Sequence, residues 1–166
     1  ELKPYAHQIF NILNSAFSDL FSFVPLNEQM VNYYVEKYMP ILSPKFVKLI
    51  LDKEGKIIGF IVGLPSLSRA MQKANGSLFP FGWWHLMKAY KKCDTIDLLL
   101  TGMDPNLQGM GYPALMMVEM QKTAQSNGAG FAETTGMIET NQKAIQNWKN
   151  YEHIQHKRKR CFIKKL

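Results

Sequence analysis

The fold is decided by the stretch Asp104-Pro105-Asn106-Leu107-Gln108-Gly109-Met110-Gly111-Tyr112-Pro113. It lies between a predicted strand, residues 95–103, and a predicted helix, residues 113–126, that an Asn-Gly pair ends. Glycines at such a junction let the backbone turn its N–H groups inward, and the helix adds unpaired N–H groups and the positive end of its dipole. This combination predicts a cradle for an anion, most naturally a phosphate.

The loop does not match the common nucleotide-binding patterns. No Lys-Ser or Lys-Thr pair follows its glycines directly, which argues against a Walker-type loop. It also lacks the pattern Gly-x-Gly-x-x-Gly, which argues against a dinucleotide-binding fold. Considered alone, a glycine-rich turn is equally compatible with a tight turn that binds nothing.

The N-terminal half predicts two helices and a hairpin. Apolar residues recur at helical spacing over residues 4–21, and Asn27 is placed to cap a second helix that Pro40 ends. Two apolar runs, residues 46–51 and 57–62, flank a short turn that contains glycine, which is typical of a β-hairpin.

A long connection, residues 64–92, follows the hairpin, with two short helices expected near 67–74 and 83–91. It carries a group of aromatic residues within 79–84. We interpret them as a cluster packed under the loop. The alternative interpretation is one wall of a substrate pocket.

The C-terminal part completes an α/β pattern of the α+β type. Residues 131–135 predict a strand, so that strand, helix and strand form a parallel unit around the loop. A last helix is expected over residues 141–151 and a final strand near 156–164. The whole chain, residues 1–166, is predicted to be a single domain.

Composition excludes several classes of protein. Apolar residues make up 46% of the chain and charged residues 20%, which argues against disorder. No apolar run approaches the roughly 20 residues of a membrane-spanning helix. Cys93 and Cys161 cannot form a disulfide framework and are expected to be reduced in a cytoplasmic protein. His7, His153 and His156 show no metal-ligand spacing, so no metal site is expected.

Positive charge is concentrated at the C-terminus. The formal net charge is +7. The last ten residues contain no acidic residue, and their basic residues are Lys157, Arg158, Lys159, Arg160, Lys164 and Lys165. The rest of the chain is therefore close to neutral. Two explanations fit such a segment equally well. It is either a solvated edge strand, or a site that binds an anionic cofactor, an acidic substrate or nucleic acid.

With its flanking strand, the loop resembles the signature of the GNAT superfamily, the acyl-CoA-dependent N-acyltransferases. In that signature an apolar strand end is followed by Asp-Pro and then by Gln/Arg-x-x-Gly-x-Gly/Ala at the start of a helix. Gln108 and Gly111 match the first two signature positions, and Pro113 replaces the third. The family's last helix commonly contains Asn-x-x-Ala-Ile, which Asn141 begins here. The order of elements also matches over most of the chain.

The resemblance implies a mixed, mostly antiparallel central sheet flanked by helices, without the first strand of the family fold. It also implies acetyl-CoA, or another acyl-CoA, as cosubstrate. In the family, the backbone at the strand end pairs with the pantetheine arm and the loop N–H groups hold the pyrophosphate. The positions implied for binding CoA are Met103, Gln108, Gly109, Met110, Gly111, Tyr112 and Asn141.

Three features depart from the family pattern, one of which is that Glu152-His153 replaces the Gly-Phe that usually follows the last helix. Pro113 has no N–H, which removes one phosphate donor, although proline is tolerated at a first helical position. The family often protonates the departing thiolate with a tyrosine of the last helix, but Trp148 stands there. Tyr151 is the implied substitute for this proton donor. The alternative is that Tyr151 only packs in the core. The missing first strand is expected for a chain cut from a longer protein, with a possible upstream domain.

A general base is needed because an ammonium group must lose a proton before it attacks a thioester. Glu133, on the strand after the loop helix, is the first candidate and Asp97 is the second. A carboxylate on a central strand is costly unless it is paired or used. His85 is a further candidate. Each candidate also has a non-catalytic interpretation. The two acids could instead form salt bridges, and the histidine could instead pack against its neighbours.

Three functions remain open. The first is an N-acyltransferase that moves an acetyl group from acetyl-CoA to a small-molecule or peptide amine by direct attack in a ternary complex. The second is a non-catalytic module that binds CoA or a partner domain, which Pro113 and Trp148 favour. The third is nucleic-acid contact through residues 156–165, for which few interleaved aromatics give thin support. We predict the first, with no nucleic acid and no membrane as partner.

Overall fold

The computed structural model describes residues 3–21 and 23–164. The helices of this part are α1 (Ala6–Phe17), α2 (Glu28–Tyr38), α3 (Ser68–Lys73), α4 (Gly82–Lys91), α5 (Tyr112–Ser126) and α6 (Gln142–Gln146). Its strands are β1 (Val47–Leu51), β2 (Ile57–Pro65), β3 (Thr95–Met103) and β4 (Phe131–Thr134).

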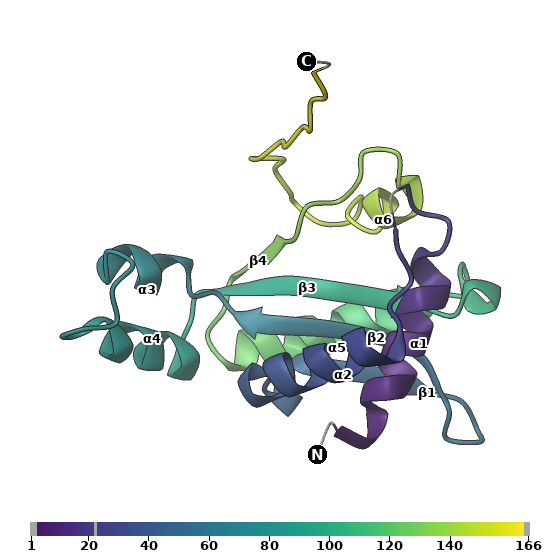
Figure 1. The fold of residues 1–166 in the computed structure, drawn as a ribbon, viewed down its shortest axis with the longest axis horizontal. Helices are drawn as coiled ribbons and strands as arrows, with labels where there is room; N and C mark the ends of the chain where they lie inside the picture. Colours follow the sequence, from purple (N-terminus) through teal and green to yellow (C-terminus); the bar gives the residue numbers. More distant parts are fainter. Residues whose placement is uncertain (1–2, 22, 165–166) are drawn as a thin grey trace.

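The strands form one four-stranded sheet in the order β1-β2-β3-β4. β2 pairs with β1 and with β3 in antiparallel fashion, whereas β3 pairs with β4 in parallel. The predicted hairpin and the predicted parallel unit around α5 are both confirmed. So is the mixed, mostly antiparallel sheet flanked by helices (Figure 1).

Helices cover both faces of the sheet, α5 on one side and α1 with α2 on the other (Figure 1). On the α5 side the core contains Ile61, Ile96 and Met116. On the α1 side Leu13 packs with Phe60 and other apolar residues. Because both faces are covered, β2 is buried along almost its whole length, as expected for a strand with apolar residues on both sides.

Local signals account for both ends of α2 and for the end of α5. The side chain of Asn27 accepts a hydrogen bond of 2.9 Å from the Met30 N–H, so α2 begins as predicted. α2 ends at Tyr38, shortly before Pro40. α5 ends before Gly128, whose φ of 86° is suited to the left-handed position after a helix. α1 is shorter than the predicted span of residues 4–21 because its ends form turns.

The C-terminal segment differs from the prediction. α6 covers only Gln142–Gln146 of the expected span 141–151, and turns follow it. The predicted strand near 156–164 is wrong, because residues 152–164 have no regular structure and extend from the body (Figure 1). A strand forms by pairing with a neighbouring edge, and the closely spaced basic residues 157–160 repel one another.

The connection between β2 and β3 also differs in one respect. The two short helices expected there form α3 and α4, which project from one end of the sheet (Figure 1). The interpretation of residues 79–84 as a packed cluster is wrong, since Phe79 is 82% exposed and Trp83 is 52% exposed. The projection carries these side chains away from the core, so no apolar surface of the sheet covers them.

Candidate functional site

The end of β3 has one unpaired edge. β2 pairs with β3 from Ile96 to Met103, but β4 pairs with it only over Thr95–Leu98. Thr135 continues the contact, since its N–H donates to the Leu98 carbonyl and its hydroxyl to the Leu99 carbonyl, each at 3.1 Å. Beyond that point β4 diverges. Within the described residues, the β4-facing edge of β3 from residue 100 to 103 has no strand partner.

The loop after β3 places free N–H groups directly beyond this edge. Gly109 and Gly111 have φ values of 85° and 81°, in the left-handed region that glycine favours. The Asp104 carboxylate accepts the Asn106 N–H at 2.9 Å and holds the start of the loop. None of the backbone N–H groups of residues 108–112 donates to another group in the described part of the chain. With the N-terminus of α5, they can bind an anion.

A cation lies beside this loop that sequence reasoning missed. The Lys143 ammonium group donates to the Gln108 side-chain oxygen at 3.1 Å and so brings α6 against the loop. Asn141 caps α6 by accepting the Ala144 N–H at 3.2 Å, which leaves its amide NH₂ for other partners. Its position two residues after Asn141 could have suggested Lys143 as a site residue. Only the fold shows that the Lys143 side chain reaches Gln108.

Asp97 is a half-buried carboxylate in the middle of the sheet. It pairs in register with Leu64 of β2 and with Glu133 of β4. Its Oδ1 atom is buried and has no hydrogen-bond partner within the described residues. Burial raises the pKa of Asp97, the Ser66 hydroxyl opposes that rise, and the negative charge of Glu133 adds to it. A buried, unsatisfied carboxylate oxygen costs free energy, which marks Asp97 as a functional candidate.

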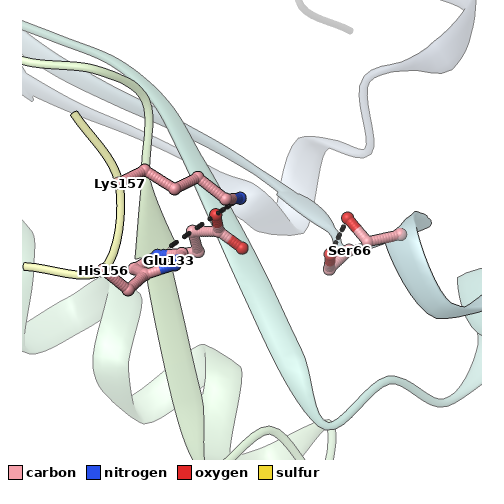
Figure 2. Close-up of polar contacts among 5 residues, drawn as sticks. Ser66, Glu133, His156 and Lys157 are labelled. Atoms are coloured by element: carbon pink, nitrogen blue, oxygen red, sulfur yellow. Dashed lines mark hydrogen bonds and ion pairs between the residues drawn. The ribbon is translucent and has the colours of Figure 1, made fainter. Parts of the chain in front are cut away.

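Glu133 has a different environment. Its Oε1 atom lies 2.7 Å from the Lys157 ammonium and 3.4 Å from His156 Nε2, as Figure 2 shows. The hydrogen bond from Lys157 lowers the pKa of Glu133. Glu133 is thus the anchor of the basic C-terminal segment, and a paired carboxylate with a lowered pKa is a weaker proton acceptor than Asp97.

The structure brings together most of the residues predicted to bind CoA. Met103 ends β3, and residues 108–112 form the loop that follows it. Asn141 lies two residues before the lysine that contacts Gln108. Glu133 lies nearer the other end of β3, opposite Asp97. The ring of Tyr151 lies tilted against that of Trp148, with the ring centroids 5.8 Å apart, and Trp148 packs against the α5-side core. The role of Tyr151 as an acid stays a prediction.

Comparisons with solved structures identify the fold. The chain superposes on a ribosomal-protein-alanine N-acetyltransferase from Brucella melitensis biovar Abortus with a TM-score of 0.57 and 10% identity, covering 96% of this chain and 94% of that one. The chain has the GNAT fold. A GNAT family acetyltransferase from Brucella melitensis in complex with acetyl-CoA gives a TM-score of 0.52 and 14% identity, covering 87% of this chain and 77% of that one.

A third similar structure is Naa20 from Chaetomium thermophilum in complex with a bisubstrate analogue. It has a TM-score of 0.55 and 22% identity, and covers 84% of this chain and 63% of that one. No model of a protein family matches this GNAT-fold chain.

Two curated proteins are similar in sequence. A bacterial ceramide synthase from Caulobacter vibrioides is 27% identical over 163 residues, covering 93% of this chain and 42% of that protein. Protein YghO from Escherichia coli is 36% identical over 76 residues, covering 46% of this chain and 19% of that protein. The GNAT-fold chain therefore spans less than half the length of the curated relatives it matches.

Residues 3–21 and 23–164 contain neither a membrane span nor a metal cluster. No helix of this part is long and apolar enough to cross a membrane. No group of three or more His, Cys, Asp or Glu side chains there could hold a metal ion.

Proposed function

We propose that the chain is an acyl-CoA-dependent N-acyltransferase that binds both substrates before transfer. The observation that carries the proposal is the unpaired edge of β3, which leads directly into a loop of N–H groups without partners in the described part of the chain. An extended substrate arm pairs with the edge, and a phosphate at its end accepts from the loop.

The donor fits this surface in three ways. Residues 108–112 supply N–H donors for the pyrophosphate, and the α5 N-terminus supplies a favourable dipole even though Pro113 gives no N–H. Lys143 adds a positive charge beside Gln108. The backbone near Met103 pairs with the pantetheine arm and thereby sets the thioester next to β3.

Transfer proceeds by direct attack. After the ammonium group has lost one proton, the amine nitrogen forms a C–N bond to the thioester carbonyl carbon. The C–S bond then breaks, and the sulfur leaves as a thiolate that takes up the second proton, which the nitrogen loses as the amide forms. The proton lost by the ammonium group passes to the Asp97 carboxylate. Burial raises the pKa of Asp97, so its carboxylate accepts a proton more readily than an exposed one does. Glu133 is the weaker candidate because Lys157 neutralises it.

The transferred acyl group and the acceptor follow from the relatives by analogy. Acetyl-CoA is the donor in the Brucella melitensis complex, which supports acetyl transfer. A ceramide is a fatty amide, so the name of the Caulobacter vibrioides relative supports transfer to an amine as well. The acceptor is a small-molecule or peptide amine, and the reaction takes place in the cytoplasm.

The proposal is tested by measuring thiol release from acyl-CoA in the presence of a panel of amines. We expect release that saturates with acyl-CoA and that falls about 10²- to 10⁴-fold in Asp97→Asn, the usual contribution of a general base. Glu119→Gln, on the exposed surface of α5, is the matched control and should keep the rate of the parent. CoA binding without thiol release for any amine would identify a non-catalytic module instead.

A further inference from the structure

A cavity of about 390 Å³ lies between the sheet and the helices α1 and α2. Its walls are almost entirely carbon, and they include Phe10 and Leu13 of α1, Tyr34 and Tyr38 of α2, and Leu64 of β2. A closed core leaves few voids larger than a water molecule. This cavity is open to solvent on one side, and its size and apolar walls are suited to an apolar ligand.

The sheet directs two further leucines into this cavity. In the pairing of β2 with β3, Val62 is opposite Leu100 and Gly63 is opposite Leu98, so Leu99 is inserted as a bulge. Both Leu99 and Leu100 line the cavity, and Leu100 is 38% exposed. The bulge lies where β4 diverges from β3, so the cavity reaches the point where the donor edge begins.

A carboxylate stands on the same side of the sheet. Residues directly opposite each other in an antiparallel pair project to the same face, so Asp97 shares the face of Leu64. Leu64 lines the cavity, and Asp97, directly opposite Leu64 in the sheet, has a buried Oδ1 atom without a hydrogen-bond partner within the described residues. A carbon-walled cavity beside one carboxylate is complementary to a cation that carries an apolar chain.

We propose that the acceptor is an amine with a hydrocarbon chain, whose chain occupies the cavity and whose ammonium group meets Asp97. This inference rests on the proposed function and names its acceptor class. If a methylene group occupies about the volume of one water, roughly 30 Å³, the cavity holds on the order of ten methylene groups. The acyl chain of the donor is the less suitable occupant because it has no charge to pair with Asp97.

The experiment is a calorimetric titration of n-alkylamines from butylamine to decylamine into the CoA-saturated chain. We expect affinity to rise about fourfold per added methylene, the value for complete burial. Leu100→Arg places a charge at the cavity mouth and should abolish the rise. Leu115→Arg on α5, where the leucine is 60% exposed, is the matched control and should preserve it. Asp97→Asn should lower the affinity for decylamine about tenfold and leave the affinity for decanol unchanged.

The outcomes separate the two proposals. CoA binding with alkylamine affinities that do not depend on chain length overturns the cavity assignment and leaves the proposed function in place. The wild-type series alone decides this point, whatever the stability of the variants. If dodecanoyl-CoA gains affinity over acetyl-CoA through the cavity and alkylamines do not, the cavity holds the acyl group and the inference is wrong. Failure of CoA itself to bind removes the proposed function.

An independent observation concerns the extension formed by α3 and α4. Its exposed apolar side chains are Leu78, Phe79, Phe81, Trp83, Trp84 and Met87. The sequence has no acidic residue between Glu54 and Asp94. The basic residues of the extension are Arg69, Lys73, Lys88, Lys91 and Lys92. Exposed aromatic side chains among lysines are the composition of a segment that lies in the interface of an anionic bilayer.

We infer that this extension binds the surface of an anionic lipid bilayer. The expectation of no membrane partner rested on the lack of a spanning segment, which does not bear on surface binding. Trp83→Ser combined with Trp84→Ser should reduce cosedimentation with phosphatidylcholine vesicles that contain phosphatidylglycerol by about tenfold or more. Phe131→Ser, at a residue 71% exposed on β4, is the matched control and should bind like the parent.

Two results would overturn this second inference. One is equal vesicle binding by the tryptophan double variant and the control. The other is self-association of the chain in sedimentation velocity that the double variant abolishes, which would assign the aromatic surface to a second copy. Each lysine near an anionic surface contributes to attraction. Pure phosphatidylcholine vesicles carry no net charge, so the chain should bind them weakly.

Discussion

Replacing Met110 with glutamate tests the anion cradle with little disturbance of the fold. Met110 is 65% exposed and lies between two glycines with positive φ, while its own backbone conformation is an ordinary one. A carboxylate at this position introduces negative charge among the N–H groups of residues 108–112 and causes no strain. Substitution at Gly111 would mix charge with strain, since its φ is 81°.

Coulomb's law gives the size of the effect. Two unit charges 4 Å apart interact by about 1 kcal/mol in water and about 4 kcal/mol at an effective dielectric constant of 20. The loop is at the surface, so the repulsion between the introduced carboxylate and a bound pyrophosphate should be about 2 kcal/mol. That energy corresponds to a loss of CoA affinity of roughly 30-fold. Lower ionic strength should increase the loss, because the Debye length grows.

The assay is calorimetric titration of CoA into three proteins: the parent, Met110→Glu and Met110→Gln. Glutamine has the same shape as glutamate and no charge, so Met110→Gln should bind CoA within about twofold of the parent. Circular dichroism should show the same fold for all three. Equal affinities for the two variants at low salt would refute the placement of the pyrophosphate on this loop.

Three further predictions concern single residues around the site. Lys143→Met should weaken CoA binding about fivefold, the effect of one exposed ion pair at low salt, and calorimetry would show it. Burial raises the pKa of Asp97 above its ordinary 3.8, so the unfolding free energy should fall as pH rises through that raised pKa. Asp97→Asn should remove this fall in urea unfolding measured from pH 3 to 7. Gly102→Ala should lower the free energy of unfolding by about 1–3 kcal/mol through overpacking, because the added Cβ would lie 2.6 Å from Phe60. Gly130→Ala is the control: its added Cβ meets nothing within 4 Å, so it should leave the free energy of unfolding unchanged in the same assay.

Local chemistry made the loop and its flanking elements predictable. Asp-Pro, two glycines and a following helical period act within a few residues of one another, so the strand, turn and helix could be placed from sequence. The same holds for the Asn27 cap and for the hairpin of β1 and β2. These signals concern backbone conformation and apolar periodicity, which a sequence carries directly.

The ranking of the two carboxylates needed the structure. Sequence reasoning put Glu133 first because it follows the loop helix. Strand register places Asp97 opposite Glu133. Glu133 forms an ion pair with Lys157, whereas Asp97 forms no ion pair with any residue that the structure describes. Contacts between residues 24 positions apart in the chain, such as Lys157 with Glu133, have no local signature.

The exposed aromatic group and the apolar cavity also depend on tertiary placement. Aromatic residues usually pack in a core, but α3 and α4 project from the sheet and leave Phe79 exposed. The cavity depends on how α1 and α2 lie over the bulge at Leu99. Periodicity predicts that these helices have an apolar face, but it does not determine how closely that face approaches the sheet.

The most direct test of acyl-CoA binding at this site is a nuclear magnetic resonance titration of CoA that follows each backbone amide. The predicted result is saturable shifts in the amides of residues 108–112 and of β3 from residue 100 to 103, with smaller changes around Lys143. Shifts confined to the basic segment near residues 157–160 would mean that CoA binds there through charge alone. That result, or no saturable shift at all, would contradict the assignment of the donor site to β3 and its loop.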